Sequence, residues 1–252
     1  KTRTLGISKS NVDYFNKNIS NISKILWPIK KIKIYSENSG DNEIIKFEDK
    51  KDNLFSIIKN EKIFEQLDKE LKKNEFFRLK KDTGYKNFNK SDYDLFINCD
   101  LKNEITKKFF FKKLEKNYNS TALTTVIDHE NLKSNNTAFQ IFTNRGPIAF
   151  LPISNQKTSI VYSMRIKKLD TKFDIKSLIK KFNLNYQIKK IYKISKFNLS
   201  SLNLRQYYKD NILAFGDLLH KLHPLAGQGF NMSIRDIKKL LEIINNKIEL
   251  GL

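Results

Sequence analysis

The stretch from Gly216 to Asn231, GDLLHKLHPLAGQGFN, decides the fold that we predict, because it joins a strand end, a glycine-rich turn and a helix start. Before it, the apolar residues 211–215 are typical of a buried parallel strand. After it, apolar residues recur every three or four positions as far as Ile248, which indicates an amphipathic helix packed on a sheet. The predicted order is therefore a strand, an acidic residue at its carboxyl end, a turn and a helix.

This order of elements has a chemical use. The first turn of a helix leaves backbone N–H groups without partners and carries partial positive charge, so it attracts a phosphate or a developing anion. Gly227 and Gly229 let a ligand approach the backbone closely. Asp217 lies where open α/β sheets bind ligands and can accept hydrogen bonds from sugar-like hydroxyls. From these residues alone, a cofactor loop and a turn whose glycines serve only packing remain equal alternatives.

The longer motif over residues 216–236, GDxxHxxHPLAGQGxNxxxRD, resembles the second flavin motif of the FAD-dependent aromatic hydroxylases. Within that family it is most similar to the ubiquinone-biosynthesis hydroxylase branch. Two further segments resemble the same branch in the same order, namely RTLGIS at residues 3–8 with WPI at 27–29, and FTNRGPIAFLP at 142–152. The similarity is thin, extends over nearly the whole chain, and is most specific at residues 216–236.

The resemblance implies a mixed α/β fold, in which a Rossmann-like FAD/NAD(P)-binding domain carries an inserted antiparallel substrate-binding sheet. It predicts the cofactor domain at residues 1–27, 59–117 and 201–252, and the substrate domain at 28–58 and 118–200. The family begins with a strand and a GxGxxG turn that hold the ADP half of FAD, and this sequence contains no such segment. We therefore expect a chain truncated at both ends, with half of a flavin site.

The activity that the resemblance implies is hydroxylation of an aromatic ring of a polyprenylated phenol in ubiquinone biosynthesis, with FAD as cofactor and NAD(P)H and O2 as co-substrates. The implied cofactor-binding residues are Arg3, Asp100, Asp217, Pro224, Gly227, Gln228, Gly229 and Asn231. Pro224 and Leu225 would lie near the flavin face, and no residue is assigned to catalysis with certainty. Phe142, Phe150 and Pro152 are either candidates for an apolar substrate cavity or plain core residues.

A second strand-end acid, Asp100, follows the short buried strand that we predict at residues 94–99. The family has an Asp-Gly pair at this point, with Asn-Ser and an arginine a few residues later. Asp100 and Asn103 match that pattern, whereas Leu101 replaces the glycine. Because residues other than glycine adopt a positive φ only at a cost, we expect an altered turn and altered handling of the reductant. The alternative is that Asp100 is a simple strand-to-helix cap.

Composition and charge limit the kinds of binding partner that the chain can have. The 252 residues carry a formal net charge of +21 with a pI of about 9.8, which ordinarily suggests nucleic acid or an anionic membrane. Only six of the 48 basic residues are arginine, the residue that bidentate nucleic-acid contacts favour. We therefore expect no nucleic-acid partner. Peripheral contact with an inner membrane and with other ubiquinone-biosynthesis proteins is a weaker expectation.

Cysteine and histidine usage adds three further expectations. The single cysteine, Cys99, excludes an internal disulfide and fits a reducing cytoplasm, and no apolar run approaches the roughly 18 residues of a transmembrane helix. His220 and His223 have too few converging ligands around them, so we expect no metal site. We expect His129 to be a structural histidine. The alternatives to an enzyme are a catalytically impaired flavoprotein-like scaffold in a biosynthetic assembly and a basic nucleic-acid-binding protein.

The rest of the chain alternates between helical and strand patterns. We expect helices at residues 10–18, 57–73, 105–114 and 174–182, and strands at 29–34, 44–47, 94–99, 121–130, 138–142, 148–152 and 159–166. A turn at residues 39–41 is expected to join the first two of these strands into a hairpin.

Overall fold

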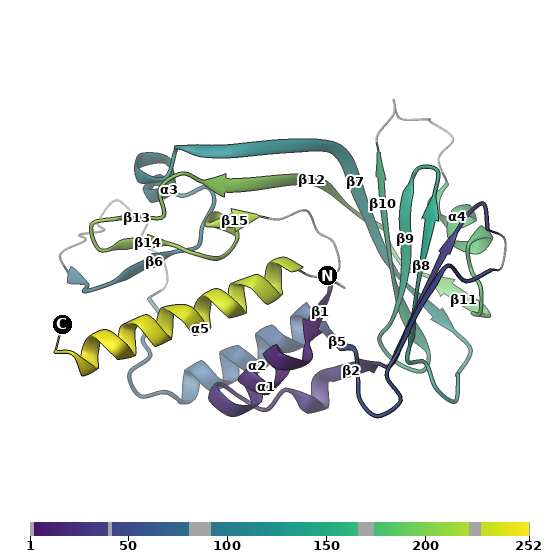
Figure 1. Cartoon of the computed structure of the whole chain (residues 1–252), viewed down its shortest axis with the longest axis horizontal. Coiled ribbons are helices and arrows are strands. Elements are labelled where there is room, and N and C mark those ends of the chain that lie inside the picture. The colour runs from purple at the N-terminus through teal and green to yellow at the C-terminus, as the bar shows by residue number, and fades with distance from the viewer. Residues whose placement is uncertain (1–2, 40–41, 81–91, 166–173, 222–227, 252) are drawn as a thin grey trace. The chain divides into compact units, whose positions relative to one another are not determined.

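The computed structural model describes residues 3–39, 42–80, 92–165, 174–221 and 228–251. The chain divides into two compact units, of which the first comprises residues 1–73 and 119–199 and the second comprises residues 74–118 and 200–252. Two long strands, β7 (Lys113–His129) and β12 (Ser195–Leu204), contribute residues to both units (Figure 1). Each unit has its own hydrophobic core.

The first unit combines two sheets with helices. Besides its parts of β7 and β12, its elements are β1 (Thr4–Ser8), α1 (Lys9–Asn18), η1 (Ser23–Ile25), β2 (Leu26–Ile29), β3 (Lys31–Ser36), β4 (Ile45–Glu48), β5 (Phe55–Lys59), α2 (Asn60–Lys73), β8 (Thr137–Thr143), β9 (Gly146–Pro152), β10 (Lys157–Arg165), α4 (Ile175–Lys181) and β11 (Ile188–Ile191). The helices predicted at residues 10–18 and 174–182 are confirmed as α1 and α4. The hairpin of β3 and β4 is confirmed, while Gly40 and Asp41 of its predicted turn lie outside the described residues.

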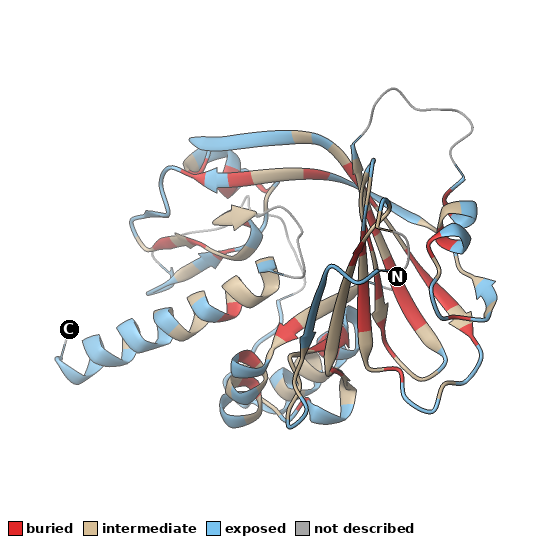
Figure 2. Cartoon of the chain, turned by 45° about the vertical axis from the view of Figure 1, so that its right-hand side comes forward, coloured by how far each residue is buried: buried red, intermediate tan, exposed pale blue. Residues whose placement is uncertain are grey.

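The larger sheet, to which the first unit contributes most strands, has the order β15, β12, β7, β10, β9, β8, β3, β4, and β11 also pairs with β7. The four strands predicted between residues 121 and 166 are confirmed as consecutive antiparallel neighbours, whereas β3 and β8 pair in parallel. Buried and partly buried residues alternate along β9, in which Ile148, Phe150 and Pro152 are the buried ones, as expected for one face of a strand. Figure 2 shows buried stretches on the strands of the first unit. Phe150 and Pro152 are therefore core residues, and Phe142 is 47% exposed.

His129 is a structural histidine, as predicted, and is only 3% exposed. Its Nδ1 lies 2.8 Å from the carbonyl oxygen of Glu130, so Nδ1 carries a proton, and its Nε2 lies 3.0 Å from Oγ1 of Thr158. The ring of Tyr186 packs on the imidazole at 4.4 Å between centroids, and its hydroxyl donates to Oδ1 of Asn135 at 3.1 Å. Burial raises the pKa of Tyr186 to about 12. These buried polar groups satisfy one another, which is the condition under which they stabilise a core.

The turn between β8 and β9 depends on a glycine. Gly146 has a φ of +136°, a conformation that side chains of L-residues rarely adopt. A Cβ atom at this position would lie 2.1 Å from the carbonyl oxygen of Ser163 on the facing strand β10. Two independent constraints therefore require glycine at the start of β9.

The smaller sheet of the first unit has the order β1, β5, β2, with antiparallel pairing throughout. The helix predicted over residues 57–73 begins at Asn60 instead, because Ile57 and Ile58 belong to the central strand β5 of this sheet and are buried there. Two adjacent isoleucines are compatible both with the start of an amphipathic helix and with a buried strand. Pairing of this segment with β1 and β2 makes it a strand. At the junction of β5 and α2, the N–H group of Asn60 donates to the carbonyl oxygen of Arg3, the residue before β1, at 2.9 Å.

The second unit contains the strands and the helix that flank the motif at residues 216–236. Besides its parts of β7 and β12, its elements are β6 (Phe96–Asn98), α3 (Glu104–Phe109), β13 (Tyr208–Lys209), β14 (Ile212–Ala214), η4 (Gly216–Leu218), β15 (His220–Lys221) and α5 (Gln228–Glu249). The predicted strand and long helix on either side of the turn are confirmed as β14 and α5. The helix predicted at 105–114 ends at Phe109, because the chain enters β7 at Lys113.

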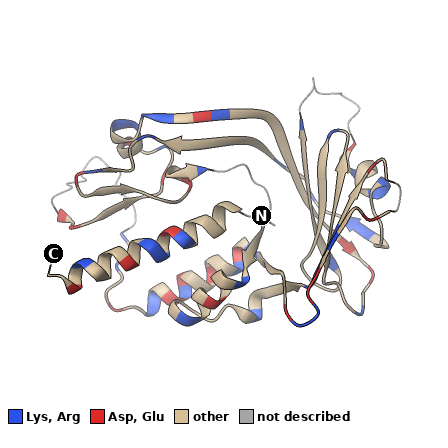
Figure 3. Cartoon of the chain, in the orientation of Figure 1, with Lys and Arg blue, Asp and Glu red and all other residues tan. Residues whose placement is uncertain are grey.

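Charged side chains are distributed over the strands and helices of both units rather than gathered on one element (Figure 3). Several lysines pair with carboxylates, as Lys31 and Lys46 do with Glu48, whose pKa they lower to about 2. In the described part of the chain, no helix is long and apolar enough to cross a membrane. Over the same ranges, no group of three His, Cys, Asp or Glu side chains is placed to hold a metal ion.

Candidate functional site

The carboxyl ends of β6 and β14 form the sheet edge at which predicted cofactor residues meet. The two strands are parallel, with Ala214 opposite Asn98, and the N–H group of Phe215 donates to the carbonyl oxygen of Asn98 at 2.9 Å. Asp100 follows β6 by two residues, and Asp217 lies in η4 directly beyond β14. Both predicted strand-end acids therefore lie beyond the same edge of one sheet, where open α/β sheets bind ligands.

Asp217 is presented to solvent by the turn that carries it. Gly216 has a φ of +61°, which lets the chain leave β14 sharply, and Leu218 is buried in the core of the second unit. The carboxylate of Asp217 between them is exposed. Cys99 is exposed, but partial burial of its thiol raises the pKa of that group, and the negative charge of Asp217 raises it further. The end of β6 and the turn after β14 are thus close enough for their side chains to interact.

The side chains of Asp100 and Asn103 each accept a hydrogen bond from a backbone N–H group between β6 and the first turn of α3. Oδ1 of Asp100 accepts from the N–H group of Lys102 at 2.7 Å, and Oδ1 of Asn103 accepts from the N–H group of Thr106 at 2.8 Å. Asn103 is therefore the N-cap of α3. Buried Asn98 supports it by accepting from Nδ2 of Asn103 at 2.7 Å and donating to Oγ1 of Thr106 at 2.8 Å. Sequence reasoning missed this network, although Asn103 was matched to the family pattern.

Leu101 does not impose a strained turn. Among the described residues other than glycine, positive φ values occur at Asn119 and Asp210 and not at Leu101. Its side chain packs against the core of the second unit instead. The turn after β6 therefore needs no glycine conformation at this position, and the effect of Leu101 on the reductant remains a prediction.

The start of α5 provides donors and open space. This helix has 22 residues, begins at Gln228 and has no acidic residue in its first turn, so its N-terminal N–H groups can face an anion. A Cβ atom at Gly229 would meet no atom of the described residues within 4 Å, so these residues leave the backbone approachable there. The helix contacts η4, the turn that carries Asp217. A helix start and an exposed carboxylate in the same unit fit a ligand with both anionic groups and hydroxyls, as FAD has.

The structure brings together some of the predicted cofactor residues. Asp100, Asp217, Gln228, Gly229 and Asn231 all belong to the second unit. Pro224, Leu225 and Gly227 lie outside the described residues. Arg3 is an exposed residue of the first unit, directly before β1.

Sequence reasoning also missed a contact between His220 and Asp236. Nε2 of His220 in β15 lies 3.1 Å from Oδ2 of Asp236 in α5. The two residues are the first histidine and the last aspartate of the motif at residues 216–236, which is the signal that could have identified them. Sixteen positions separate them, so no periodicity within one element predicts the contact.

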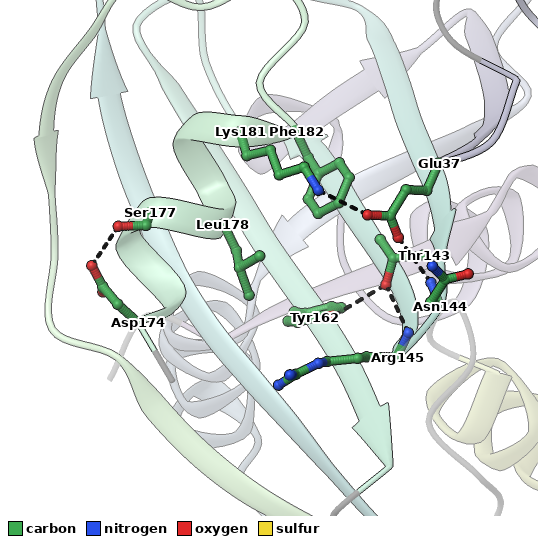
Figure 4. Close-up of a pocket in the computed structure, with 10 residues that line it drawn as sticks. All are labelled: Glu37, Thr143, Asn144, Arg145, Tyr162, Asp174, Ser177, Leu178, Lys181 and Phe182. Carbon is green, nitrogen blue, oxygen red and sulfur yellow. Dashed lines mark hydrogen bonds and ion pairs between the residues drawn. The ribbon is translucent and has the colours of Figure 1, made fainter. Parts of the chain in front are cut away.

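A separate pocket of about 460 Å³ lies in the first unit, between α4 and the turn from β8 to β9 (Figure 4). Its lining residues are Glu37, Thr143, Asn144, Arg145, Tyr162, Asp174, Ser177, Leu178, Lys181 and Phe182. Glu37 holds three segments together, because it accepts from Lys181 Nζ of α4 at 2.8 Å and from the N–H group of Asn144 at 3.0 Å. These two donors lower the pKa of Glu37. None of the predicted cofactor residues that the structure describes lines this pocket.

The pKa shift of Glu37 predicts a pH-dependent stability. A carboxyl whose pKa is lower in the folded state stabilises that state fully above its unfolded pKa of about 4.3, and the stabilisation is lost as pH falls through the folded pKa. Glu37→Gln should therefore lower the free energy of unfolding by up to about 1 kcal/mol at pH 7, and the difference from wild type should vanish in more acidic solution. Urea unfolding at several pH values measures this. Glu65→Gln, which breaks an exposed pair with Lys62 on α2, is the control and should change less. A difference for Glu37→Gln that does not depend on pH would contradict the prediction.

Comparison with known proteins adds a family and its relatives. A family model described as FAD binding domain matches residues 107–249, more than half of the chain. The mitochondrial ubiquinone biosynthesis monooxygenase COQ6 of Schizosaccharomyces pombe is 27% identical over 203 residues, which cover 62% of this chain and 42% of that protein. The 3-demethoxyubiquinol 3-hydroxylase of Escherichia coli is 28% identical over 141 residues, which cover 53% of this chain and 36% of that protein. The chain spans less than half the length of these two relatives.

Solved structures share the fold at low sequence identity. pqsL, a probable FAD-dependent monooxygenase from Pseudomonas aeruginosa, has a TM-score of 0.74 and 13% identity, and the match covers 100% of this chain and 78% of that chain. HpxO of Klebsiella pneumoniae, solved with FAD and uric acid, has a TM-score of 0.68 and 10% identity, with 94% and 68% of the two chains covered. The predicted mixed α/β fold class is thereby confirmed.

Proposed function

The chain belongs to the FAD binding domain family, and from this premise we propose that it is part of an FAD-dependent monooxygenase of ubiquinone biosynthesis. The reaction would be hydroxylation of an aromatic ring of a polyprenylated phenol, with NAD(P)H as reductant. The names of the relatives from Schizosaccharomyces pombe and Escherichia coli support this choice of pathway. The observation that carries the proposal is the shared sheet edge of β6 and β14, beyond which Asp100 and Asp217 lie, in the unit that also contains α5.

The chain's own residues would bind and orient the cofactor. When bound, FAD supplies the redox chemistry by which one oxygen atom of O2 enters the ring and the other leaves as water. The exposed carboxylate of Asp217 would accept hydrogen bonds from hydroxyl groups of the ligand. The N–H groups in the first turn of α5, at Gly229 and its neighbours, would stabilise negative charge. Asp100 would act through the turn it closes.

The single cysteine gives a direct test of where FAD binds. Cys99 is exposed and lies at the end of β6, in electrostatic contact with Asp217. FAD bound at this edge would cover the thiol, so alkylation should slow about ten-fold when FAD is present at ten times its dissociation constant. The measurement is the rate of alkylation of the chain by a maleimide, alongside the visible absorbance of the flavin.

Two controls complete this test. Alkylation of glutathione under the same conditions reports any effect of FAD on the reagent, and ATP in place of FAD reports the effect of phosphate groups alone. Unchanged alkylation of Cys99 together with a colourless protein would contradict the proposal. A chain that binds FAD and yet does not support NAD(P)H oxidation would favour the alternative, a flavoprotein-like scaffold.

The proposal includes a lipophilic aromatic substrate and peripheral contact with an inner membrane. Strand β4 supports the membrane contact, because Ile45 and Phe47 are exposed on it and Ile44 is exposed just before it. Lysines flank these apolar side chains, among them Lys46 on the same strand. Exposed apolar groups beside basic residues are typical of surfaces that associate with anionic lipids.

A further inference from the structure

His220 and Asp236 belong to the motif at residues 216–236, and the proposed function gives neither of them a role. Their side chains approach to 3.1 Å between Nε2 and Oδ2, with 19% and 27% of the side chains exposed. The two atoms are shielded from solvent, and within the described residues neither of them makes a well-aligned hydrogen bond, to the other or to any further group, so their contact is an electrostatic one. Shielded polar atoms interact more strongly than an exposed pair, and either atom is costly to bury alone. The pair therefore fixes the elements that carry it.

Those elements surround the turn that carries Asp217. His220 lies in β15, which pairs with β12 through His220 and Asn203. Asp236 lies in α5, eight positions after Gln228, which is about 12 Å along the helix axis. The turn η4 contacts both β15 and α5. The contact of His220 with Asp236 thus joins β15 directly to α5, and the turn η4 contacts both of them.

We infer that His220 and Asp236 are positioning residues, which hold α5 against β15 beside the turn that carries Asp217 and thereby orient the first turn of the helix. This inference rests on the proposed function, because the ligand to be positioned is FAD. The buried side chain of Ile234 anchors the same helix by apolar contact, but such contact has no direction. The buried contact of His220 with Asp236 joins one position on α5 to one position on β15, so it limits the rotation of α5 about its axis and with it the direction of the N–H groups at Gly229.

A comparison of conservative and alanine variants distinguishes loss of the contact between His220 and Asp236 from the general effect of a substitution at these positions. His220→Gln keeps a donor nitrogen in the place of Nε2, and Asp236→Asn keeps an acceptor oxygen, whereas His220→Ala and Asp236→Ala remove the contact. We expect each alanine variant to bind FAD about ten-fold more weakly than wild type and each conservative variant to stay within about three-fold. Quenching of flavin fluorescence measures the dissociation constants. The matched control is Glu242→Gln, which breaks an exposed pair with Lys239 on the same helix and should leave FAD affinity unchanged.

Amide hydrogen exchange tests the positioning without FAD. In the alanine variants, exchange over residues 229–233 should accelerate about ten-fold, while exchange in β6 and in the first unit stays as in wild type. If wild type binds no FAD, the proposed function fails, and this exchange pattern still decides whether the pair positions α5. Unchanged exchange at residues 229–233 in both alanine variants would overturn the inference. So would acceleration spread evenly over the chain, or equal losses in the alanine and conservative variants, since either would indicate a general structural role.

Discussion

Replacement of Gly146 by alanine is expected to destabilise the first unit by about 3 kcal/mol or more. The added Cβ would lie 2.1 Å from the carbonyl oxygen of Ser163, so β9 and β10 must separate or the turn must change. The φ of +136° adds backbone strain, because L-residues rarely adopt it. Urea unfolding followed by the fluorescence of Trp27, the single tryptophan and a residue of the first unit, measures the effect.

Substitutions at two other glycines distinguish the steric clash at Gly146 from its backbone strain. Gly216 and Gly251 also have positive φ values, +61° and +70°, but a Cβ at either position would meet nothing within 4 Å. Gly216→Ala and Gly251→Ala should therefore cost no more than about 1–2 kcal/mol each, measured by circular dichroism. A Gly146→Ala chain as stable as these controls would show that the hairpin of β8 and β9 tolerates the side chain.

Replacement of Asp217 by alanine is expected to weaken FAD binding about thirty-fold, which corresponds to about 2 kcal/mol. The variant removes the exposed carboxylate that would accept hydrogen bonds from the ligand, while Gly216 and Leu218 keep the turn and its anchor. Asp217→Asn retains one acceptor oxygen and should lie between wild type and alanine. Titration of flavin fluorescence gives the dissociation constants.

The control for Asp217 is Glu104→Ala on α3. Glu104 is an exposed carboxylate that follows β6 and pairs with Lys107 at 2.6 Å, so its loss should leave FAD affinity within about two-fold of wild type. A second measurement does not depend on FAD. Because the charge of Asp217 raises the pKa of Cys99, Asp217→Ala should lower that pKa and speed alkylation near pH 8. An unchanged affinity of Asp217→Ala for FAD would show that Asp217 does not bind the cofactor.

Sequence patterns predicted the elements whose signals are local. The apolar spacing of α5, the strand β14 before the turn, and the hairpins of β8, β9 and β10 were all predictable, because period and turn residues agree there. The motif at residues 216–236 also pointed to the correct family, which the match over residues 107–249 confirms.

Elements that depend on distant partners were not predictable. β1 and β12 were missed, because the five residues of β1 are too few to show a pattern and lysine, serine and asparagine weaken the pattern of β12, so both depend on their neighbours in the sheet. β5 was assigned to a helix because its two buried isoleucines have no alternation. In the candidate site, strand order predicted where Asp100 and Asp217 would lie. The polar network of Asn98 with Asn103 depends on side-chain geometry that spacing does not encode.

The parallel pairing of β6 with β14 has a consequence for the order in which the molecule folds. Asn98 and Ala214 face each other in this pair although more than a hundred positions separate them in the chain, whereas β8, β9 and β10 pair through short turns. Closing so long a loop costs conformational entropy before the contact repays it, and distant pairing slows folding. On a ribosome, β6 must wait for β14 to emerge. The sheet edge that carries Asp100 and Asp217 is therefore expected to assemble late, after the local hairpins have formed.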